Sequence, residues 1–524
     1  MKQILLTSLL SLTISSSFAQ NITLEANSEE VNKYKSTITE SEMKSHLSIL
    51  ASDEFEGRET GERGQKMAAD YIAQFFMDQG LQGPVPNVPN PYFQQFDLYN
   101  QKYTNFTLSK GNVSMQLIED IFPYGNFSFQ KELEVVFIGY GEDNEGVSDY
   151  QNIDVKGKGV VFFENTPSKY GASNKMSGLR KKAKIAAERG ASFAIVISES
   201  DEKFNTQSSR YGSYISKGRL TFEKPSETSD NGFGLILVKP SSFFKMIGVD
   251  QKKLEKQIDK AIAKGKPSAT GESYKMEINA KFSTRKMPTE NVLGFMEGTD
   301  LKDEVLVVTS HYDHVGIING EIHNGADDDG SGTTGLLEII NAFSQAKKEG
   351  NGPRRSILFM TVTGEEKGLL GSEYYSDHPI FPLEKTIADL NIDMIGRGDE
   401  AHSENPDFVY VIGADMLSSE LHELHEQVAK KYVPELDLDY TYNAKDDPNR
   451  YYYRSDHYNF AKHGIPVIFY FNGTHEDYHQ PTDTVDKITF GPMAKRAKLV
   501  FSTAWELANR DKAPIVDQKT EQQK

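Results

Sequence analysis

The C-terminal half of the chain alternates short β-branched runs with segments of helical periodicity, and this alternation constrains the fold more than any other feature. From about residue 290 onward, strands are predicted at VLVVTS, SILFMTVTG, IADLNIDMIG, FVYVIGA and IPVIFYFNG. Helices are predicted between or after them, at GSGTTGLLEIINAFSQAKK, SSELHELHEQVAKKYV and residues 492–509. Apolar strands that alternate with helices predict an α/β domain, with a mostly parallel central sheet and helices on both faces.

A strand-rich region interrupts this domain. Between residues 112 and 278, short apolar runs bounded by turn residues predict strands, with one clear helix at 176–189. A chain of 524 residues also exceeds one ordinary hydrophobic core. We therefore predict an insertion at 112–278 within a discontinuous domain of residues 20–111 and 279–510. The polar segment 511–524 is predicted to be a disordered tail.

Composition excludes some partners and some site chemistry. The formal net charge is -18, from 58 Lys and Arg against 76 Asp and Glu. No nucleic-acid partner is expected, because such proteins present a basic face. The sequence has no cysteine, so it forms no disulfide and offers no thiolate to a metal. Any zinc site would have to be built from His, Asp and Glu.

The first nineteen residues have the pattern of a secretory signal peptide. Lys2 forms a short positive region, an apolar stretch follows, and Ser17-Phe18-Ala19 is a small-x-small cleavage site. The apolar stretch is too short and too rich in Ser and Thr to span a bilayer, which needs about 20 apolar residues. We expect cleavage after Ala19, export to the periplasm or the exterior, and no membrane span elsewhere.

An aspartate triplet lies among residues with very small side chains. The stretch from His323 to Gly335 reads HNGADDDGSGTTG, with Asp327, Asp328 and Asp329 adjacent. Like charges this close repel one another, and glycines disfavour regular structure. A bound cation would offset the repulsion, so the triplet suggests a metal site.

Other metal-type side chains follow the predicted strands. His311 and Asp313 come after VLVVTS, Glu365-Glu366 after SILFMTVTG, Asp393 near the end of ADLNI, and His479 after the last strand. Carboxyl ends of parallel strands meet at one edge of a sheet, so these side chains are expected to converge. Two divalent ions at about 3.5–4 Å need an anionic bridge, which one aspartate of the triplet can supply.

These stretches resemble the co-catalytic zinc exopeptidases related to bacterial leucyl aminopeptidases and, more distantly, to glutamate carboxypeptidase II and the glutaminyl cyclases. The matching stretches are SHYDH, NGADDDGSGTTGLLEI, TGEEKGLLGSEYY, NIDMIGR, YRSDHYNFAKHGIPVIF and DYHQPTDT, in the family's order. The resemblance covers about 35–111 and 279–510. In the insertion, VKGKGVVFFE and KAKIAAERGASFAIVIS resemble a protease-associated (PA) domain.

The resemblance implies roles for individual residues. Asp328 matches the aspartate that bridges two zinc ions. Glu365 matches the general base, and Asp313 matches the acid that orients the first histidine. Tyr452 falls near the tyrosine that donates to the oxyanion in some members, with Tyr453 as the alternative. The remaining ligands match in two pairs, one for each ion: His311 with Asp393, and Glu366 with His479.

Neighbouring residues receive less specific interpretations. Asp327 and Asp329 are expected to shape the turn, and Asp456 and His457 to support the ligands. Four histidines near the motifs are expected to pack or form hydrogen bonds rather than bind metal: His314, His323, His457 and His475. Arg454 is a departure from the simplest aminopeptidases; it would meet a substrate carboxylate or pair with an acidic residue.

The implied function is an exported two-zinc aminopeptidase that hydrolyses peptides with a free N-terminus. Three alternatives stay open at this point. A glutaminyl cyclase has the same fold but binds one zinc and transfers rather than hydrolyses. A carboxypeptidase would use Arg454 to bind a terminal carboxylate. A binding protein without activity would lack ligands, whereas all five positions here hold competent residues. The sequence does not predict the preferred residue or the oligomeric state.

Overall fold

The computed structural model describes residues 22–125, 127–144, 147–167, 176–224 and 233–518. These residues form two compact units. The first comprises residues up to Phe96 together with those from Thr289 onward, and the second comprises Asp97–Pro288. The candidate ligands all belong to the first unit.

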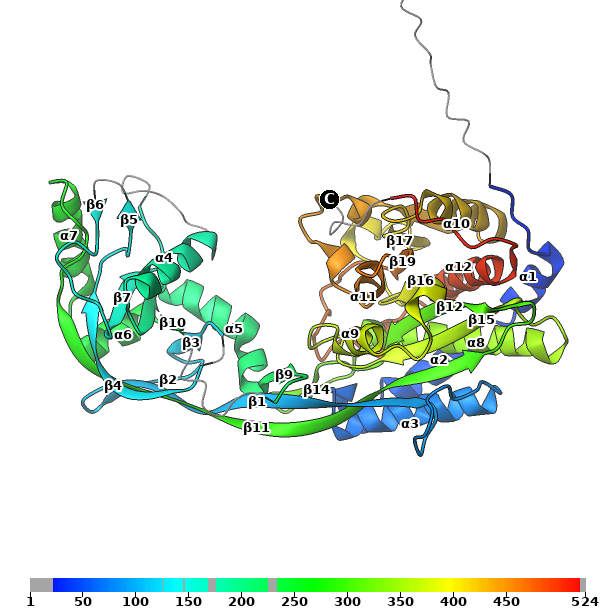
Figure 1. Cartoon of the computed structure of the whole chain (residues 1–524), viewed down its shortest axis with the longest axis horizontal. Helices are drawn as coiled ribbons and strands as arrows, with labels where there is room; N and C mark the ends of the chain where they lie inside the picture. Colours follow the sequence, from blue (N-terminus) through cyan, green and yellow to red (C-terminus); the bar gives the residue numbers. More distant parts are fainter. Residues whose placement is uncertain (1–21, 126, 145–146, 168–175, 225–232, 519–524) are drawn as a thin grey trace, which may run out of the picture. The chain divides into compact units, whose positions relative to one another are not determined.

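The first unit contains a mostly parallel sheet in the strand order β18-β17-β19-β16-β12-β15-β11 (Figure 1). Strand β12 is parallel to both β15 and β16, and β16 is parallel to β19. Along this strand order, the antiparallel neighbours are β17 with β19 and β15 with β11. The bounds are β12 Leu301–His311, β15 Arg355–Val362, β16 Thr386–Ile392, β17 Phe408–Ile412, β18 Asp437–Asp439 and β19 Val467–Phe471. The predicted sheet is confirmed.

Helices cover both faces of this sheet, as predicted. Along β12, Leu306 and Val308 pack into one apolar cluster, while Val305 and Val307 pack into another, because successive side chains of a strand point to opposite faces. The first cluster includes α1 (Ser28–Lys35), α2 (Glu40–Leu50), α3 (Arg63–Asp78), α8 (Gly332–Lys348), α10 (Ser419–Tyr432) and α12 (Phe490–Asn509). The second includes α9 (Leu370–Asp377) and α11 (His457–Ala461).

Local sequence signals set the helix ends. Helix α10 begins after Ser418, whose hydroxyl accepts a hydrogen bond from the backbone N–H of Leu421 at 3.1 Å. Glu420 lies in its first turn, and Lys430 and Lys431 lie in its last turn, which matches the helix dipole. The cap and the charges explain why the helical periodicity predicted this element closely.

The second unit is also α/β, in the strand order β11-β4-β7-β8-β10-β3. Strands β4, β7, β8 and β10 are parallel neighbours. Its strands are β2 Val113–Gln116, β3 Ile121–Pro123, β4 Phe129–Phe137, β5 Asp143–Asn144, β6 Val147–Ser148, β7 Gly159–Phe163, β8 Phe193–Ile197, β9 Arg219–Thr221 and β10 Gly234–Val238. Its helices are α4 Met176–Glu188, α5 Asp201–Lys217, α6 Pro240–Ile247 and α7 Gln251–Ile262. It is therefore richer in helix than the sequence pattern indicated.

The units divide at positions that differ from the predicted boundaries. The chain enters and leaves the second unit through two long paired strands, β1 (Phe93–Lys110) and β11 (Ser273–Met296). The division falls at 96/97 and 288/289, inside these strands, rather than at 111/112 and 278/279. Both strands are rich in polar residues and continue through the division, so a change in composition does not mark the boundary.

The tail is ordered further than predicted. Asp517 accepts a hydrogen bond from the backbone N–H of Ser419 at 3.0 Å, at the start of α10. The backbone N–H of Ile515 donates to Glu420 at 3.0 Å, and Arg354 pairs with Asp511 at 2.7 Å. Residues 511–518 are thus held by specific polar contacts, which correct the predicted disorder there. Residues 519–524, like the predicted signal peptide, lie outside the described residues.

Within the described chain, every helix is too short or too polar to cross a bilayer.

Candidate metal centre

The predicted ligands come from the carboxyl ends of neighbouring strands. His311 is the last residue of β12, Glu365 and Glu366 follow β15, and Asp393 follows β16 directly. His479 lies in the loop after β19. Parallel strands place these positions at one edge of the sheet, so residues far apart in sequence meet there.

Asp328 reaches the same edge from a turn before α8. Residues Ala326–Ser331 form this turn, and the peptide bond between Asp328 and Asp329 is cis. Gly325 precedes the turn with φ +57°, and a Cβ there would lie 2.3 Å from the Asp328 carbonyl and 2.5 Å from the His314 ring. The glycine is therefore needed for both its conformation and its small size.

The two flanking aspartates hold this turn in place. Asp327 accepts hydrogen bonds from the backbone N–H of Gly396 at 2.6 Å and from His475 at 3.1 Å. Asp329 accepts from the backbone N–H groups of Met394 at 2.9 Å and Gly332 at 2.8 Å. The side chains of Asp327 and Asp329 are thus engaged within the protein, and the triplet offers Asp328 to the site.

One group of donor atoms surrounds His311. Its Nε2 lies 3.3 Å from Asp328 Oδ1 and 3.5 Å from Asp393 Oδ1. Ser455 donates to the other oxygen of Asp393 at 2.6 Å, which fixes that carboxylate. Burial alone would lower the pKa of His311, but Glu365 and Asp393 raise it well above its usual value. These three donors lie close enough together to hold one metal ion.

A second group surrounds Glu366 and shares Asp328. His479 Nε2 lies 2.9 Å from Asp328 Oδ2 and 3.1 Å from Glu366 Oε2. The other oxygen of Glu366 lies 2.9 Å from Nδ1 of His314, a fully buried side chain. Burial opposes the ionised form of Asp328, yet His311 and His479 hold the pKa of this carboxyl well below its usual value. Asp328 therefore presents one oxygen to each group.

Several donor atoms in these groups have no hydrogen-bond partner among the described residues although they are buried. They are His311 Nε2, His314 Nδ1 and Nε2, Asp328 Oδ2, Glu366 Oε1 and His479 Nε2. Unpaired polar atoms are costly in a protein interior. Nitrogen and carboxylate donors that converge without partners fit two divalent ions with Asp328 between them.

Glu365 lies beside the two groups with its side chain 12% exposed. Its Oε2 is 4.0 Å from His311 Nε2, the longest of the distances to that nitrogen. Burial, together with the charges of Asp393 and Glu366, raises the pKa of Glu365 well above its usual value, against the lowering effect of His311. A carboxylate with a raised pKa at the rim of such a site can accept a proton.

Asp313 supports the site in a different way from that expected. Its backbone carbonyl, not its carboxylate, lies 3.0 Å from His311 Nδ1, while the nearer carboxylate oxygen is at 3.8 Å. The carboxylate accepts from the backbone N–H of Glu365 at 3.2 Å and from Thr60 at 2.6 Å. Burial raises its pKa to about 6. Asp313 thus positions both His311 and Glu365.

A small cavity opens onto the donor groups. One part of the cavity is acidic and is lined by Glu365, Asp328 and Asp393. Another part is mostly apolar and is lined by Met394, Phe469, Phe471 and Tyr451. The remaining lining residues are Arg454, Thr474 and Tyr478. Tyr452 is not among the lining residues; it contacts Gly413 and the ring of His457. Tyr478, which the sequence analysis did not select, stacks on the ligand His479 at 3.9 Å between ring centroids.

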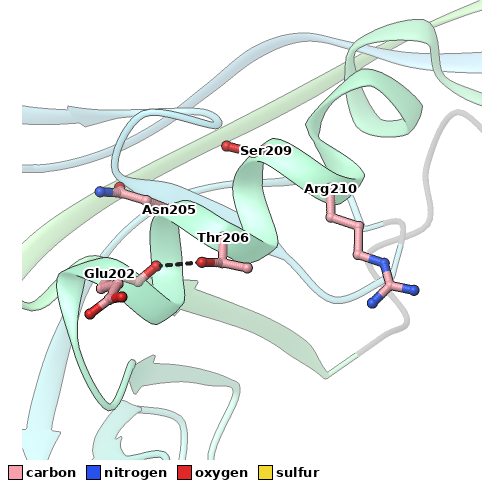
Figure 2. Close-up of a pocket in the computed structure, with 5 residues that line it drawn as sticks. All are labelled: Glu202, Asn205, Thr206, Ser209 and Arg210. Atoms are coloured by element: carbon pink, nitrogen blue, oxygen red, sulfur yellow. Dashed lines mark hydrogen bonds between the residues drawn. The ribbon is translucent and has the colours of Figure 1, made fainter. Parts of the chain in front are cut away.

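A second depression lies in the other unit, on α5. The depression is lined by Glu202, Asn205, Thr206, Ser209 and Arg210 (Figure 2). All five residues belong to one helix, where the hydroxyl of Thr206 donates to the backbone carbonyl of Glu202 at 3.0 Å. The described part of this unit contains no group of three metal-type donors. The candidate chemistry therefore belongs to the first unit.

The chain is thus an α/β protein with two groups of metal-type donor atoms at its strand ends. Residues 291–504 match the model of peptidase family M28. The match confirms the predicted family resemblance for this part of the chain.

Curated relatives match part of the chain. Aminopeptidase YwaD of Bacillus subtilis is 25% identical over 319 residues, which are 57% of this chain and 63% of the relative. A probable leucine aminopeptidase of Arthroderma otae is 31% identical over 217 residues, which are 39% of this chain and 55% of the relative. The alignments thus span less than two thirds of either relative.

Solved structures show the same fold over nearly the whole chain. An aminopeptidase from Aneurinibacillus sp. strain AM-1 has a TM-score of 0.57 at 18% identity, covering 94% of this chain and 98% of that one. A zinc aminopeptidase from Bacillus subtilis has a TM-score of 0.52 at 19% identity, covering 92% and 98%. At these identities the likeness concerns the fold alone.

Proposed function

We propose that the protein is a zinc-dependent aminopeptidase that removes N-terminal residues from peptides. The observation that carries the proposal is the pair of donor groups that share Asp328, one oxygen to each. The match to family M28 and the aminopeptidase names of its relatives support it. Relatives named as zinc enzymes, and a donor set of imidazoles and carboxylates without thiolates, support zinc as the metal.

Five side chains would hold two zinc ions. His311 and Asp393 would bind one ion, Glu366 and His479 the other, and Asp328 both. When bound, such ions lower the pKa of water and polarise the scissile carbonyl. His314, which the sequence analysis assigned to packing, would donate from Nδ1 to Glu366 and fix the orientation of this ligand, because their atoms lie 2.9 Å apart.

Glu365 would act as the general base and acid. Its carboxylate takes a proton from water as the water oxygen attacks the peptide carbonyl carbon. The same proton then passes to the nitrogen of the leaving peptide as the C–N bond breaks. The carboxylate of Asp313 would hold Glu365 in place, because it accepts a hydrogen bond from the backbone N–H of Glu365.

Tyr478 is a better candidate than Tyr452 for the oxyanion donor. The hydroxyl of an oxyanion donor must reach the reacting carbonyl oxygen. Tyr478 lines the cavity next to His479, whereas Tyr452 contacts Gly413 and His457 instead. We therefore assign the proposed role to Tyr478.

The second unit would influence which substrates reach the active site and would not take part in the reaction. We propose that it is a PA-like insertion, on the resemblance of its β7 and α4–β8 stretches to such domains. Its described residues supply no candidate ligand, which is consistent with this role. Export through the predicted signal peptide and peptides with a free N-terminus as partners complete the proposal.

A peptide assay with chelator controls tests the proposed function. The purified protein should release leucine from leucine p-nitroanilide and should not cleave the N-acetylated substrate. A chelator should abolish turnover, and added zinc should restore it. Cyclisation of an N-terminal glutamine peptide without hydrolysis, or cleavage of blocked substrates only, would contradict the aminopeptidase assignment.

A further inference from the structure

Arg454 is the one cation among the residues that line the candidate active-site cavity. Its guanidinium carbon lies 4.7 Å above the ring of Tyr451, and its side chain lies near Tyr478. Both tyrosines line the same cavity. Arg454 is nevertheless an exposed residue.

Other arginines of this unit are engaged by the protein itself. Arg397 pairs with Asp477 at 3.1 Å. Arg58 and Arg496 donate to backbone carbonyls, including those of Gly325 and Phe408. By contrast, Arg454 forms no ion pair with a carboxylate anywhere in the described chain, and the carboxylate that acts on it is Glu365 at longer range. The pairing with an acidic residue that the sequence left open is thus not observed.

The rest of the cavity indicates where a substrate would place its groups. Met394, Phe469 and Phe471 are almost fully buried and form an apolar part suited to an uncharged side chain. The acidic residues of the cavity belong to the metal centre. A negatively charged group of the substrate would therefore find one favourable partner among the lining residues, at Arg454.

We propose that Arg454 selects substrates that carry a carboxylate close to the scissile bond. This inference rests on the proposed aminopeptidase function. A guanidinium binds a carboxylate through two parallel N–H···O hydrogen bonds, a geometry that lysine lacks. The stacking on Tyr451 holds the group in place before substrate arrives, which lowers the entropic cost of binding.

The carboxylate has two possible sources in a short peptide. It is either the C-terminal carboxylate of a dipeptide or tripeptide, or the side chain of an acidic residue. Matched substrates separate them: Leu-Ala against Leu-Ala-amide for the terminus, and Leu-Glu-amide against Leu-Gln-amide for the side chain. Each pair differs in the carboxylate and in little else.

The test compares kcat/KM for both pairs in the wild-type enzyme and in Arg454→Gln. The wild-type enzyme should prefer the carboxylate member of at least one pair by roughly 10- to 100-fold, the usual worth of a hydrogen bond to a charged group. In Arg454→Gln this ratio should fall close to one, whatever happens to the rates themselves. Arg454→Lys should keep a reduced preference.

Arg450→Gln is the matched control. Arg450 lies in the same loop and stacks on Tyr453 at 4.6 Å, but it does not line the cavity. Its substitution should leave the wild-type ratio unchanged. Equal loss in both arginine variants would mean that general charge in the loop, not Arg454, sets the preference.

Binding measurements separate this inference from the proposed function. Titration of zinc-loaded Glu365→Gln protein with Leu-Ala and with Leu-Ala-amide measures the preference without turnover, and the Leu-Glu-amide pair is titrated in the same way. If no peptide is cleaved but a carboxylate preference in binding disappears with Arg454→Gln, Arg454 keeps its role and the aminopeptidase function falls. If the wild-type enzyme cleaves both members of each pair equally well, or if Arg454→Gln leaves the ratio intact, the inference is overturned.

Discussion

Both compact units place acidic residues near the ends of parallel strands, but they balance the charge in different ways. In the second unit, Glu142 lies within 3.9 Å of Lys182, and Glu164 lies 3.4 Å from Lys203. In the first unit, the ion-pair partners of Asp328, Glu366 and Asp393 among the described residues are histidines. Lysine pairs complete a folded structure, whereas the histidine cluster leaves negative charge and donor atoms unpaired.

This difference teaches how to separate a structural charge cluster from a metal site. A buried carboxylate beside a lysine already has its counter-ion. An imidazole must lose its proton to bind a metal, so a carboxylate beside metal-binding imidazoles takes the bound cation as its counter-ion. Substitutions in the first unit should therefore change metal content or turnover, while substitutions in the second should change fold stability.

Among these substitutions, we expect the largest loss of activity for Glu365→Gln. The amide cannot accept the proton of water, so kcat should fall by about 10²–10⁴-fold. The Michaelis constant should change little, because Glu365 contributes to the transition state rather than to docking. Zinc analysis and steady-state kinetics measure the two properties separately, and the variant should retain both ions.

Glu366→Gln is the matched control for this variant, since it makes the same chemical change one residue further on. It should lower the occupancy of one zinc, with activity partly restored by added metal. An exchange of these phenotypes, with zinc lost from Glu365→Gln and kept by Glu366→Gln, would reverse the assigned roles.

We expect a smaller effect, on zinc affinity, for His314→Gln. Loss of a residue that orients a metal ligand typically weakens metal binding by roughly 10–100-fold. Competition with a zinc indicator measures the change at one of the two sites. The control is His425→Gln, because His425 is also fully buried with unpartnered ring nitrogens among the described residues but lies on α10. Unchanged zinc affinity in His314→Gln would remove it from the metal centre.

The smallest effect on metal is expected for Lys182→Met in the second unit. The variant should bind zinc as the wild-type protein does. It should nevertheless lose about 3 kcal/mol of unfolding free energy, because Glu142 is left buried without its partner. Urea unfolding measures the stability, and zinc analysis of the same sample measures the metal content. Loss of zinc with unchanged stability would contradict the comparison between the two units.

The pH dependence of the same pair sharpens this test. Burial lowers the pKa of Lys182 to about 8 in the folded protein, from 10.5 for an unperturbed lysine. Between these values the unfolded state binds more protons, so the folded state gains stability as the pH rises. The unfolding free energy of the wild-type protein should therefore rise relative to Lys182→Met between pH 8 and 10.5. A flat difference would mean that Lys182 has an ordinary pKa in the folded protein.

The sheet of the first unit and the convergence of its site could be predicted because both depend on local patterns. Apolar runs mark the strands, and every candidate ligand except Asp328 lies at or after the carboxyl end of such a run. The unit boundaries could not be predicted in the same way, because β1 and β11 are polar strands that continue across the division.

The parts of the site that sequence reasoning missed depend on loop geometry. His314 and Tyr478 each lie close in sequence to a predicted ligand, and this adjacency was the available signal. Whether such a neighbour faces the site depends on turn conformation, as Gly325 shows by making room for the His314 ring. The family resemblance points to Tyr452, which contacts Gly413 and the ring of His457 and does not line the cavity.

The central claim is that Asp328 alone of the triplet joins two metal ions. Zinc content per chain, measured after equilibration with zinc and removal of the excess, tests it on three proteins. The wild-type protein and Asp327→Asn should each retain about two ions, although the second variant loses a hydrogen-bond acceptor of the turn. Asp328→Asn should retain close to none, because the amide offers one good ligand oxygen and no charge. Two ions retained in Asp328→Asn, or both lost from Asp327→Asn alone, would contradict the account.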